Sequence, residues 1–431
     1  MIMIQMENQV PYQKVEECRV CGGTDLIPYL DLGEMPLVNR LLTDPEDPDP
    51  KFPLEVLYCN DCSNSELSIV VDPSVLFRDY VYRSSMSQTY IDHCARMARL
   101  SERELDMSKG DLVVDIASND GALLQQYKPY NVRVLGIDPA TNLAKIATEE
   151  GVPTIAEFWP GDLPERIVEE HGPAKIITAT NVFAHVNDIQ GFARGVYDLL
   201  DEEGTFMVEF PYMVDLIQNG CFDTIYHEHL SYFLVSPLVD LFRRVGLDIA
   251  RVDRLPIHGG SVRLYVRKDG SIDPSVEESI LMEEEMGYHD ISRYLGFAEK
   301  TDEVREDLLA LLEQKQNRGE SVAAFGAAAK GTILLNYCDI GPEIIPYIVD
   351  DTPEKQGKYI PGMHIPVVSR DRLARSIPDN LLILPWNFLT EILSNTASFR
   401  STGGSYIAAI PRVRVIKPER MKVDRVPVTQ I

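Results

Sequence analysis

Two patterns of strand, small-residue loop and helix constrain the fold of this chain most strongly. In the first, the apolar segment 111–116 precedes the loop 117–121 and a predicted helix, and a second apolar segment ends at Asp138. A similar pattern begins at Ser321, and its second predicted strand, 344–351, also ends in acidic residues. Both patterns are typical of βαβ units, which assemble parallel sheets. The sequence therefore predicts an α/β protein with a central and a C-terminal Rossmann-like domain.

The charge of the first loop helps to identify its cofactor. Asp115 and Asp120 would repel the phosphates of a dinucleotide, whereas carboxylates suit a cofactor that carries amino and hydroxyl groups. Asp138 lies at the sequence distance expected of the acid that binds the hydroxyls of a ribose. This favours S-adenosylmethionine over NAD. The predicted cofactor-binding residues are Asp115, Ala117, Asn119, Gly121, Asp138, Pro139, Glu157, Phe158, Asn181 and Tyr90.

Three of these residues were assigned because of where the predicted strands end. Asn181 follows the strand 176–180, at the carboxyl edge where open α/β sheets bind their ligands. Glu157 and Phe158 follow a third predicted strand and would flank the adenine, although a surface turn explains them nearly as well.

The segment 78–90 is unusually rich in hydroxyl groups. One interpretation is a polar turn before the helix predicted over 91–105, with Ser87 or Thr89 as its N-cap. The other is a lid that offers hydrogen bonds to a polyhydroxylated ligand.

Four of the seven cysteines form two close pairs, Cys18-Arg-Val-Cys21 and Cys59-Asn-Asp-Cys62. Pairs with this spacing are typical of knuckles that bind zinc through four thiolates, and four protein ligands indicate a structural ion. Glycines after the first pair and Ser63 after the second provide the necessary turns. A redox dithiol and metal-free thiols are the alternatives. The remaining cysteines, at positions 94, 221 and 338, are predicted to be buried thiols without such partners.

The segment 222–232 concentrates titratable groups, including Tyr226, His227, Glu228 and His229, after the buried strand predicted over 205–210. Such groups are costly near a core unless each has a partner or a task. A neutral imidazole is a suitable general base near pH 7. Alternatively, two histidines two residues apart on a strand can bind a metal, or the cluster is a buried polar network that braces the fold.

The overall charge opposes two classes of partner. The formal net charge is −26, whereas nucleic acids and anionic membranes require clustered Lys and Arg. We therefore expect neither partner. The amino terminus lacks the basic and apolar regions of a signal peptide, and no apolar run approaches twenty residues, so a cytoplasmic location is expected.

Six motifs, in order along nearly the whole chain, resemble those of the sugar C-methyltransferases of deoxysugar and antibiotic biosynthesis. They are the four-cysteine knuckles, Tyr-Arg-Ser-Ser-Met-Ser-Gln-Thr-Tyr at 82–90, Asp-Ile-Ala-Ser-Asn-Asp-Gly at 115–121, Asn-Val-Phe-Ala-His-Val at 181–186, Tyr-His-Glu-His at 226–229 and His-Gly-Gly-Ser at 258–261. One departure is Ala117, which stands where the first loop glycine usually lies. The resemblance implies a small zinc-binding lobe, a class I S-adenosylmethionine-dependent methyltransferase domain and a C-terminal α/β domain, which we place at 1–76, 77–273 and 274–431.

The resemblance also implies roles for individual residues. His229 would be the base, Tyr226, Glu228 and His185 would complete the catalytic cluster, and Tyr82 would be a lid tyrosine. His185, on an apolar segment, is otherwise explained as a core histidine with its hydrogen bonds satisfied. The predicted substrate-binding residues are Tyr80, Ser84, His258, Gly260, Ser261, Lys330 and Asn336. A hairpin turn alone explains the glycines at 259–260 equally well.

The chemistry of these residue types agrees with carbon methylation. A carbon beside a ketone becomes a nucleophile when a base removes its proton, and the enolate oxygen then needs hydrogen-bond donors such as a phenol or an imidazole. If Glu228 orients an imidazole, the backbone must turn there, because neighbouring residues of a strand face opposite sides. The expected substrate is a nucleotide-linked, dTDP-type 4-keto-6-deoxysugar methylated at carbon 3 by a monomeric enzyme.

The resemblance implies that the C-terminal part helps to bind the nucleotide of the substrate. Helices over 274–319 join the domains, and Lys330 in the loop region suits a phosphate. Further strands are predicted at 381–384 and 405–410, with Trp386 and Asn387 at a strand end.

Four other functions remain open from the sequence: methylation at carbon 5, methylation of oxygen or nitrogen, an NAD-dependent sugar oxidoreductase and a non-catalytic zinc-binding interaction protein. Product chemistry separates the first two from methylation at carbon 3. Nicotinamide binding would favour the third, and failure to bind S-adenosylmethionine the fourth.

Overall fold

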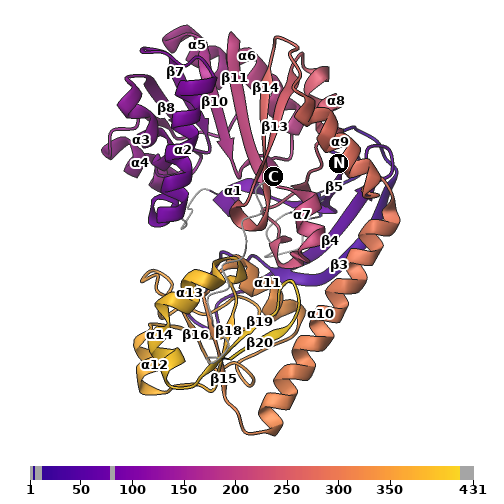
Figure 1. Ribbon diagram of the computed structural model, residues 1–431, viewed down its shortest axis with the longest axis vertical. Helices are drawn as coiled ribbons and strands as arrows, with labels where there is room; N and C mark the ends of the chain where they lie inside the picture. The colour runs from indigo at the N-terminus through magenta and orange to yellow at the C-terminus, as the bar shows by residue number, and fades with distance from the viewer. Residues whose placement is uncertain (1–2, 5–11, 78–82, 418–431) are drawn as a thin grey trace. The chain divides into compact units, whose positions relative to one another are not determined.

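The computed structural model describes residues 3–4, 12–77 and 83–417 (Figure 1). Its chain divides into two compact units. The first unit comprises Met1–Asp31, Glu55–Leu216 and His227–Tyr294, and the second comprises Leu32–Leu54, Ile217–Tyr226 and Leu295–Ile431. The domain boundaries after residues 76 and 273 stay predictions.

The first unit contains a seven-stranded sheet in the order β13-β14-β11-β10-β7-β8-β9. Its strands are β7 (Leu112–Ile116), β8 (Arg133–Ile137), β9 (Thr154–Ile155), β10 (Ala174–Thr180), β11 (Leu200–Pro211), β13 (Asp248–Leu255) and β14 (Ser261–Arg267). The pairs from β9 to β11 are parallel, and β14 runs antiparallel to both of its neighbours. The predicted βαβ unit is confirmed, and β13 and β14 form an antiparallel pair at one edge of the sheet.

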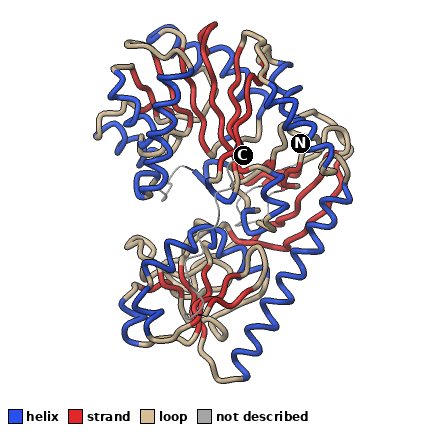
Figure 2. Tube along the Cα trace, viewed as in Figure 1, coloured by secondary structure: helices blue, strands red, loops and turns tan. Residues whose placement is uncertain are grey.

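Helices flank this sheet in Figures 1 and 2. They are α2 (Gln88–Glu104), α3 (Ala122–Tyr127), α4 (Thr141–Glu149), α5 (Leu163–His171), α6 (Ile189–Leu199), α8 (Ser236–Arg244) and α9 (Pro274–Glu285). The helices α1 (Pro73–Phe77) and α7 (Met213–Gln218) are not part of this set. The side chain of Ser87 accepts a hydrogen bond from Tyr90 N and caps α2, as predicted for one of the two candidate caps. Val113 of β7, Leu123 of α3 and Met97 of α2 are fully buried in one hydrophobic cluster, so burial of apolar side chains fixes α2 and α3 to the sheet.

The cysteine knuckles belong to a smaller β structure. A four-stranded sheet has the order β12-β5-β4-β3. Its strands are β3 (Leu26–Pro36), β4 (Lys51–Cys59), β5 (Ser65–Leu67) and β12 (Ser231–Tyr232). A second small sheet joins β1 (Met3–Ile4), β2 (Tyr12–Lys14) and β6 (Ile69–Val71). The pairing of β12 with β5 places the chain just after His229 beside the strand that follows the second knuckle.

The second unit contains a six-stranded sheet in the order β17-β16-β15-β18-β19-β20. Its strands are β15 (Val322–Phe325), β16 (Ile348–Val349), β17 (Val367–Val368), β18 (Asn380–Ile383), β19 (Ser405–Ala408) and β20 (Arg414–Ile416). The first five in this order are parallel, and β20 is antiparallel to β19. The prediction of a second parallel α/β sheet is therefore confirmed, whereas β20 was not predicted.

Two sequence predictions in this unit were wrong in detail. The strand predicted over 344–351 contains only Ile348–Val349, since the residues before it form turns and irregular backbone. Lys330 does not lie in the loop but in the first turn of α11 (Ala329–Tyr337). The other helices are α10 (Ile291–Asn317), α12 (Asp371–Arg375), α13 (Leu389–Asn395) and α14 (Ala397–Ser401).

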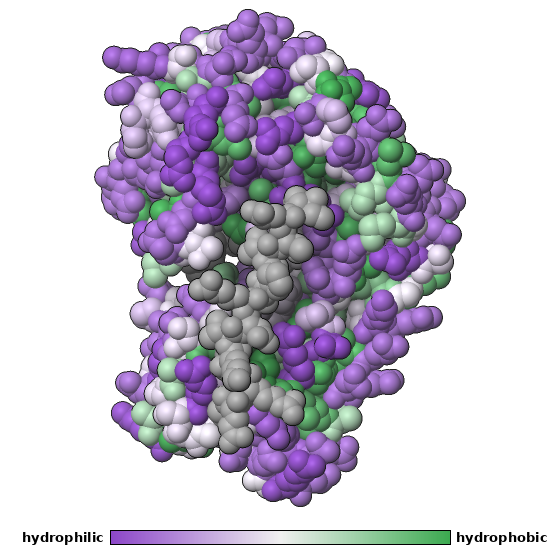
Figure 3. Space-filling view, in the orientation of Figure 1, coloured by the Kyte–Doolittle hydropathy of each residue, from purple (hydrophilic) through white to green (hydrophobic). Residues whose placement is uncertain are grey.

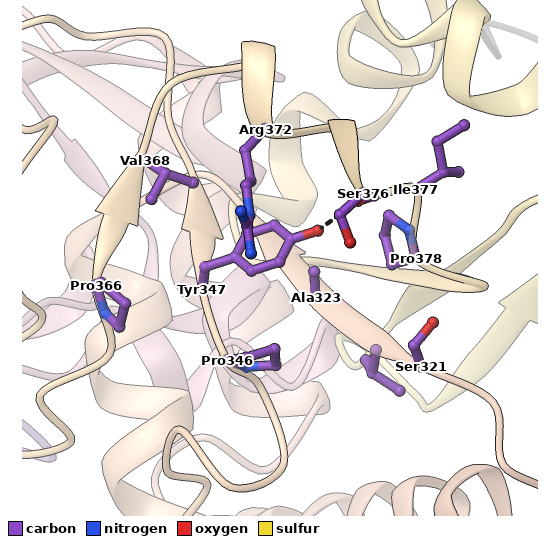
Figure 4. Close-up of a pocket in the computed structure, with 11 residues that line it drawn as sticks. Ser321, Ala323, Pro346, Tyr347, Pro366, Val368, Arg372, Ser376, Ile377 and Pro378 are labelled. Carbon is purple, nitrogen blue, oxygen red and sulfur yellow. Dashed lines mark hydrogen bonds between the residues drawn. The ribbon is translucent and has the colours of Figure 1, made fainter. Parts of the chain in front are cut away.

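The side chains on the face drawn in Figure 3 are mostly hydrophilic. Within the part of the chain that the structure describes, each helix is too short or too polar to cross a lipid bilayer. A cavity of about 330 Å³ lies at the amino ends of β15, β16 and β18, where Tyr347 donates to Ser376 O (Figure 4). It is at the edge opposite to that where such sheets bind ligands.

Candidate active site

The four paired cysteines form a site that fits zinc. Their sulfur atoms all lie within 4.8 Å of one another, with 3.7 Å between Cys18 and Cys62 and 3.5 Å between Cys21 and Cys59. Four sulfurs about 2.3 Å from a tetrahedral zinc ion would be about 3.8 Å apart. The donor set and its spacing therefore fit a structural zinc ion with four thiolate ligands.

The two knuckles share one backbone design. Gly22 and Ser63 each lie four residues after the first cysteine of their pair, and both have left-handed backbone, with φ of 78° and 66°. Gly22 N donates to Cys18 O and Ser63 N donates to Cys59 O, each over 2.8 Å. The turns predicted after both pairs are confirmed. The other cysteines, at 94, 221 and 338, are buried free thiols.

The predicted cofactor loop is held by Asp138 at the end of β8. One carboxylate oxygen of Asp138 accepts from Asn119 N over 2.7 Å, and the other accepts from Ala140 N over 2.8 Å. Each oxygen retains a second lone pair, so the fixed carboxylate can also accept a hydroxyl of a ribose. Pro139 follows it and is half-buried.

The loop itself requires unusual backbone. Ala117, Asn119 and Gly121 have φ of 59°, 52° and 80°. A Cβ on Gly121 would lie 3.1 Å from Val152 Cγ2 and 3.3 Å from Ala147 Cβ, so the small residue also permits close packing. Ala117, noted as a departure from the usual glycine, therefore adopts the left-handed conformation that a glycine would adopt more easily.

Polar atoms in this loop fit a cofactor with amino and hydroxyl groups. Among the described residues, Ser118 Oγ and Asp120 Oδ1 are buried without a hydrogen-bond partner. The other Asp120 oxygen accepts from Ser85 N over 3.2 Å, and Ser84 N donates to Asn119 Oδ1 over 3.0 Å. The segment 83–87 thus lies against the cofactor loop. Ser84, predicted to bind substrate, contacts the loop through its backbone.

Two more predicted cofactor residues meet at the carboxyl edge of the sheet. Tyr90 of α2 and Thr180 of β10 share a hydrogen bond of 2.9 Å between their hydroxyls. Asn181 directly follows, with φ of 56°, and its N–H donates to Glu209 O. Asp115 accepts a 2.6 Å hydrogen bond from Thr178, and burial raises the pKa of Asp115 to about 7 against this hydrogen bond.

A buried polar group beneath this edge was not predicted. Glu209 of β11 contacts His93 of α2 at 2.7 Å and forms an ion pair with Arg263 of β14. Although burial acts to raise it, the hydrogen bond with His93 and the charge of Arg263 hold the pKa of Glu209 below its usual range. His93 and Glu209 are distant in sequence, and neither lies in a motif that could have revealed the pair.

Glu157 and Phe158 lie on the surface after β9. Arg166 donates to both carboxylate oxygens of Glu157, over 3.1 and 3.2 Å, and 43% of Phe158 is exposed. This geometry agrees with the surface turn that was the alternative interpretation, and an adenine-contacting role for them stays a prediction.

The structure brings two predicted catalytic histidines together. The rings of His185, at the end of η3 (Phe183–His185), and His229 have centroids 5.0 Å apart. The ring of Phe77 also stacks on the ring of His185, with a centroid distance of 5.5 Å and an interplanar angle of 17°. Burial lowers the pKa of His185 to about 4. At neutral pH the ring of His185 is therefore uncharged, with one protonated nitrogen that can donate and one unprotonated nitrogen that can accept a hydrogen bond.

The backbone at 226–229 turns instead of extending as a strand. The turn that was required for Glu228 to orient an imidazole is therefore present. Glu228 and His227 are 4% and 2% exposed, whereas Tyr226 and His229 are half-buried. Among the described residues, the group placed closely enough to hold a metal ion is that of the four cysteines, and it includes neither His227 nor His229.

The glycine-rich turn between β13 and β14 packs tightly. Gly260 has a φ of 118°, and a Cβ there would lie 2.3 Å from Asp215 Cβ. Ser261 is buried, and its hydroxyl donates to Ile257 O over 3.1 Å. These contacts agree with the hairpin interpretation. His258 lies in the short helix η5 (Ile257–Gly259) of the same turn.

Lys330 belongs to a cluster in the second unit. Its Nζ lies 4.7 Å from the centroid of the Trp386 ring, and Trp386 Nε1 donates to Asp223 over 2.7 Å. Burial raises the pKa of Asp223 to about 6, and the charge of Lys330 opposes that rise. Asp223, in η4 (Phe222–Thr224), was not predicted as a site residue, although it lies in the segment singled out for its titratable groups.

Asn336 is held by the backbone around it. Its amide donates to Thr332 O over 2.9 Å and to Pro361 O over 3.0 Å. The side chain thus braces the segment beside Gly362. Tyr80 and Tyr82, predicted to bind substrate and to form the lid, lie outside the described residues.

Three family models match the chain. A zinc binding domain matches residues 18–77, a methyltransferase domain matches 82–252, and a C-methyltransferase C-terminal domain matches 256–411. Among curated proteins, C-methyltransferase NovU of Streptomyces niveus is 38% identical over 410 residues, which cover 94% of this chain and 98% of the relative.

Solved structures also resemble part of the chain. An S-adenosylmethionine-dependent methyltransferase from Mesorhizobium loti has 14% identity and a TM-score of 0.33, covering 41% of this chain and 99% of that structure. Magnesium protoporphyrin IX methyltransferase from Synechocystis, with bound S-adenosylmethionine, has 13% identity and a TM-score of 0.30, covering 42% and 79%. Similarities at this level carry no conclusion about the reaction.

Proposed function

The chain belongs to the sugar C-methyltransferase family and depends on S-adenosylmethionine, and from this premise we propose that it methylates carbon 3 of a nucleotide-linked 4-keto-6-deoxysugar. The single observation that supports this reaction most strongly is the contact between the rings of His185 and His229. Bound S-adenosylmethionine would supply an electrophilic methyl group on its sulfonium. The remaining requirements of the reaction fall to side chains of this chain.

The first requirement is a base. The proton on a carbon beside a ketone must be removed before that carbon can attack a methyl group, and a positioned imidazole contributes about 10²- to 10⁴-fold to such a step. We assign this role to His229, which is half-buried and therefore partly accessible. Glu228, buried in the turn just before it, would orient the cluster or balance the charge that the base gains.

The second requirement is a donor for the ketone oxygen, which gains negative charge as the proton leaves. His185 is uncharged at neutral pH because burial lowers its pKa to about 4. A neutral ring can donate a hydrogen bond from one nitrogen, and donors aimed at a developing oxyanion lower the barrier substantially. His185 is therefore assigned this role, with Tyr226 as a second donor.

The third requirement is binding of the two ligands. Asp138 and the loop 117–121 would hold the cofactor, with Asp138 on the ribose and Asp120 and Ser118 on its polar groups. Lys330, Trp386 and Asp223 would bind the nucleotide: the ammonium suits a phosphate, and the indole offers a flat surface.

The proposal is tested with dTDP-4-keto-6-deoxyglucose and related 4-keto-6-deoxysugars in deuterated water. We expect methylated product in the presence of S-adenosylmethionine, and exchange of the carbon 3 proton. His229→Asn should lose about 10²- to 10⁴-fold of both rates while it still binds the cofactor. The control is His171→Asn, at the exposed end of α5.

Full exchange by His229→Asn would remove the assigned base. Methylation at carbon 5 by the wild-type protein would contradict the proposed position, and methylation on oxygen would contradict the enolate mechanism.

A further inference from the structure

Arg19 is a buried cation inside the first zinc knuckle, between Cys18 and Cys21. Its side chain is only 3% exposed, and that of Glu66, with which it pairs, is 0% exposed. A buried guanidinium is costly unless several acceptors surround it. The partners of Arg19 therefore indicate what this side chain is for.

Those partners lie in three different parts of the first unit. Nη1 lies 3.4 Å from Glu66 Oε1, and it donates to Leu67 O over 3.2 Å and to Leu230 O over 3.4 Å. Nε donates to Asn187 Oδ1 over 3.1 Å. The planar guanidinium thus joins the knuckle region to the segments around residues 187 and 230.

Both of these segments carry a histidine of the candidate active site. Leu230 directly follows His229, and Asn187 lies two residues after His185. Leu230 N also donates to Ala184 O over 2.7 Å, and Leu67 N donates to Leu230 O over 2.9 Å. The backbones that carry the two histidines are therefore bonded to each other and, through Arg19, to the first knuckle.

We propose that Arg19 is a positioning residue that holds His185 and His229 at their working separation, and that the zinc knuckle serves as its rigid support. This inference rests on the proposed function of these histidines. The ring centroids lie 5.0 Å apart, and a displacement of about 1 Å at a reacting group can cost about 10²-fold in rate. Arginine suits the task because its guanidinium donates in several fixed directions, whereas a lysine ammonium does not.

Arg244 provides a matched control. From the end of α8 it donates to Val20 O over 2.7 Å and to Cys21 O over 3.4 Å, so it also fastens the first knuckle. None of these bonds reaches the segments of His185 or His229. If Arg19 only stabilised the knuckle, as the exposed Arg244 does, Arg19→Lys should lose bound zinc and deuterium exchange together.

The experiment compares both variants with the wild-type protein. Bound zinc is measured by elemental analysis, and the affinity for S-adenosylmethionine by calorimetry. The rate of deuterium uptake by dTDP-4-keto-6-deoxyglucose is measured across pH. We expect Arg19→Lys to retain zinc and cofactor affinity but to exchange roughly 10- to 100-fold more slowly, and Arg244→Lys to exchange at the wild-type rate.

A second measurement does not depend on turnover. In Arg19→Lys the imidazole resonances of His185 and His229 should shift, and the pKa of His185 should rise towards its usual value as its packing loosens. In Arg244→Lys they should stay in place. Asn187→Ala removes only one of the bonds to Arg19, so its effect should be smaller and less than additive with Arg19→Lys.

Three results would overturn the inference. The first is a normal exchange rate with unmoved resonances in Arg19→Lys, and the second is an equal loss of zinc and exchange in both arginine variants. If His229→Asn is inactive in either of these cases, the proposed function stands and only the role of Arg19 fails. The third is full exchange by His229→Asn, which would contradict both.

Discussion

The two mostly parallel sheets of this chain hold the loop after their first strand by the same hydrogen bonds but differ in the charged side chains around that loop. In the first unit, the carboxylate of Asp138 accepts from Asn119 N over 2.7 Å and from Ala140 N over 2.8 Å. In the second, Asp350 accepts from Ala327 N over 2.7 Å and from Thr352 N over 2.8 Å. In each case an acid after the second strand fastens the loop that follows the first.

The side chains around these two loops differ. Asp115 and the buried Asp120 accompany the first loop. Beside the second, Lys355 donates to Ala327 O over 2.7 Å, and Lys330 lies in the first turn of α11. A shared loop geometry therefore does not decide which ligand binds. Under the proposed function the local charge would decide it, with the cationic cofactor at the first loop and an anionic phosphate at the second.

The largest effect should be a loss of cofactor affinity when the acid that holds the first loop is removed. Asp138→Ala should weaken binding of S-adenosylmethionine by roughly 100-fold or more, because two hydrogen bonds to a charged group and the proposed contact to the ribose are lost. Asp350→Ala removes the equivalent bonds from the second loop and should leave this affinity unchanged. Calorimetry with the cofactor alone measures both, and equal losses would contradict the assignment of the cofactor to the first loop.

A smaller effect is expected at Lys330. Lys330→Met should raise KM for a nucleotide-linked sugar about tenfold, the cost of one charge-assisted hydrogen bond, and leave kcat unchanged, because the contact is the same in the ground and transition states. Steady-state kinetics at two salt concentrations measures the change. Lys300→Met, at an exposed position of α10, is the control. A fall in kcat with unchanged KM would place Lys330 elsewhere than on the nucleotide.

Most of the backbone plan could be read from the sequence, because it depends on local patterns. Apolar segments followed by small residues indicated both βαβ units, and hydroxyl groups before α2 indicated a cap at Ser87 or Thr89, of which the structure shows Ser87. The cysteine pairs and the residues after them, Gly22-Gly23 and Ser63, predicted the knuckles and their tight turns. Each of these features is determined by residues within one turn or one strand of each other.

The features that could not be predicted depend on contacts between distant residues. Nothing near Arg19 indicates that its guanidinium reaches Leu230, and nothing near His93 indicates Glu209. The sequence also placed Lys330 in the loop, since propensity alone does not locate the first residue of a helix such as α11. The contact of His185 with His229 was expected from a family resemblance, not from the spacing of the two residues.

The pH dependence of stability should distinguish the units by its sign. Burial lowers the pKa of His185 from 6.5 to about 4 in the first unit and raises that of Asp223 from 3.8 to about 6 in the second. As pH falls from 7 to 5, the unfolded chain gains a proton at residue 185, which destabilises the fold. The folded chain gains one at residue 223, which stabilises it.

Thermal unfolding of paired variants measures these two signs. As pH falls from 7 to 5, the Tm of the wild type should fall by roughly 2–4 °C relative to the Tm of His185→Gln. Over the same pH range, the Tm of the wild type should rise relative to the Tm of Asp223→Asn. If the Tm of the wild type rises relative to both variants, or falls relative to both, burial does not control the pKa of at least one of these two groups.

The smallest effect concerns the backbone of the two loops. Ala117 has a φ of 59°, whereas Ala328, in the second loop, has a φ of −97°, and both are half-buried. A left-handed alanine costs about 1 kcal/mol or more, and a glycine in place of an alanine loses about 0.5–1 kcal/mol through the entropy of the unfolded chain.

The two terms oppose each other at residue 117, so Ala117→Gly should leave the free energy of unfolding unchanged or raise it slightly. No left-handed strain is relieved at residue 328, and the entropic loss is partly offset because residue 328 is the N-cap of α11, where glycine is preferred to alanine. Ala328→Gly should therefore lower the free energy of unfolding by less than about 1 kcal/mol. Denaturant unfolding of both variants gives the comparison. If both variants lose the same stability, the left-handed backbone at residue 117 is not strained, and the alanine there is as well suited to the first loop as the alanine at 328 is to the second.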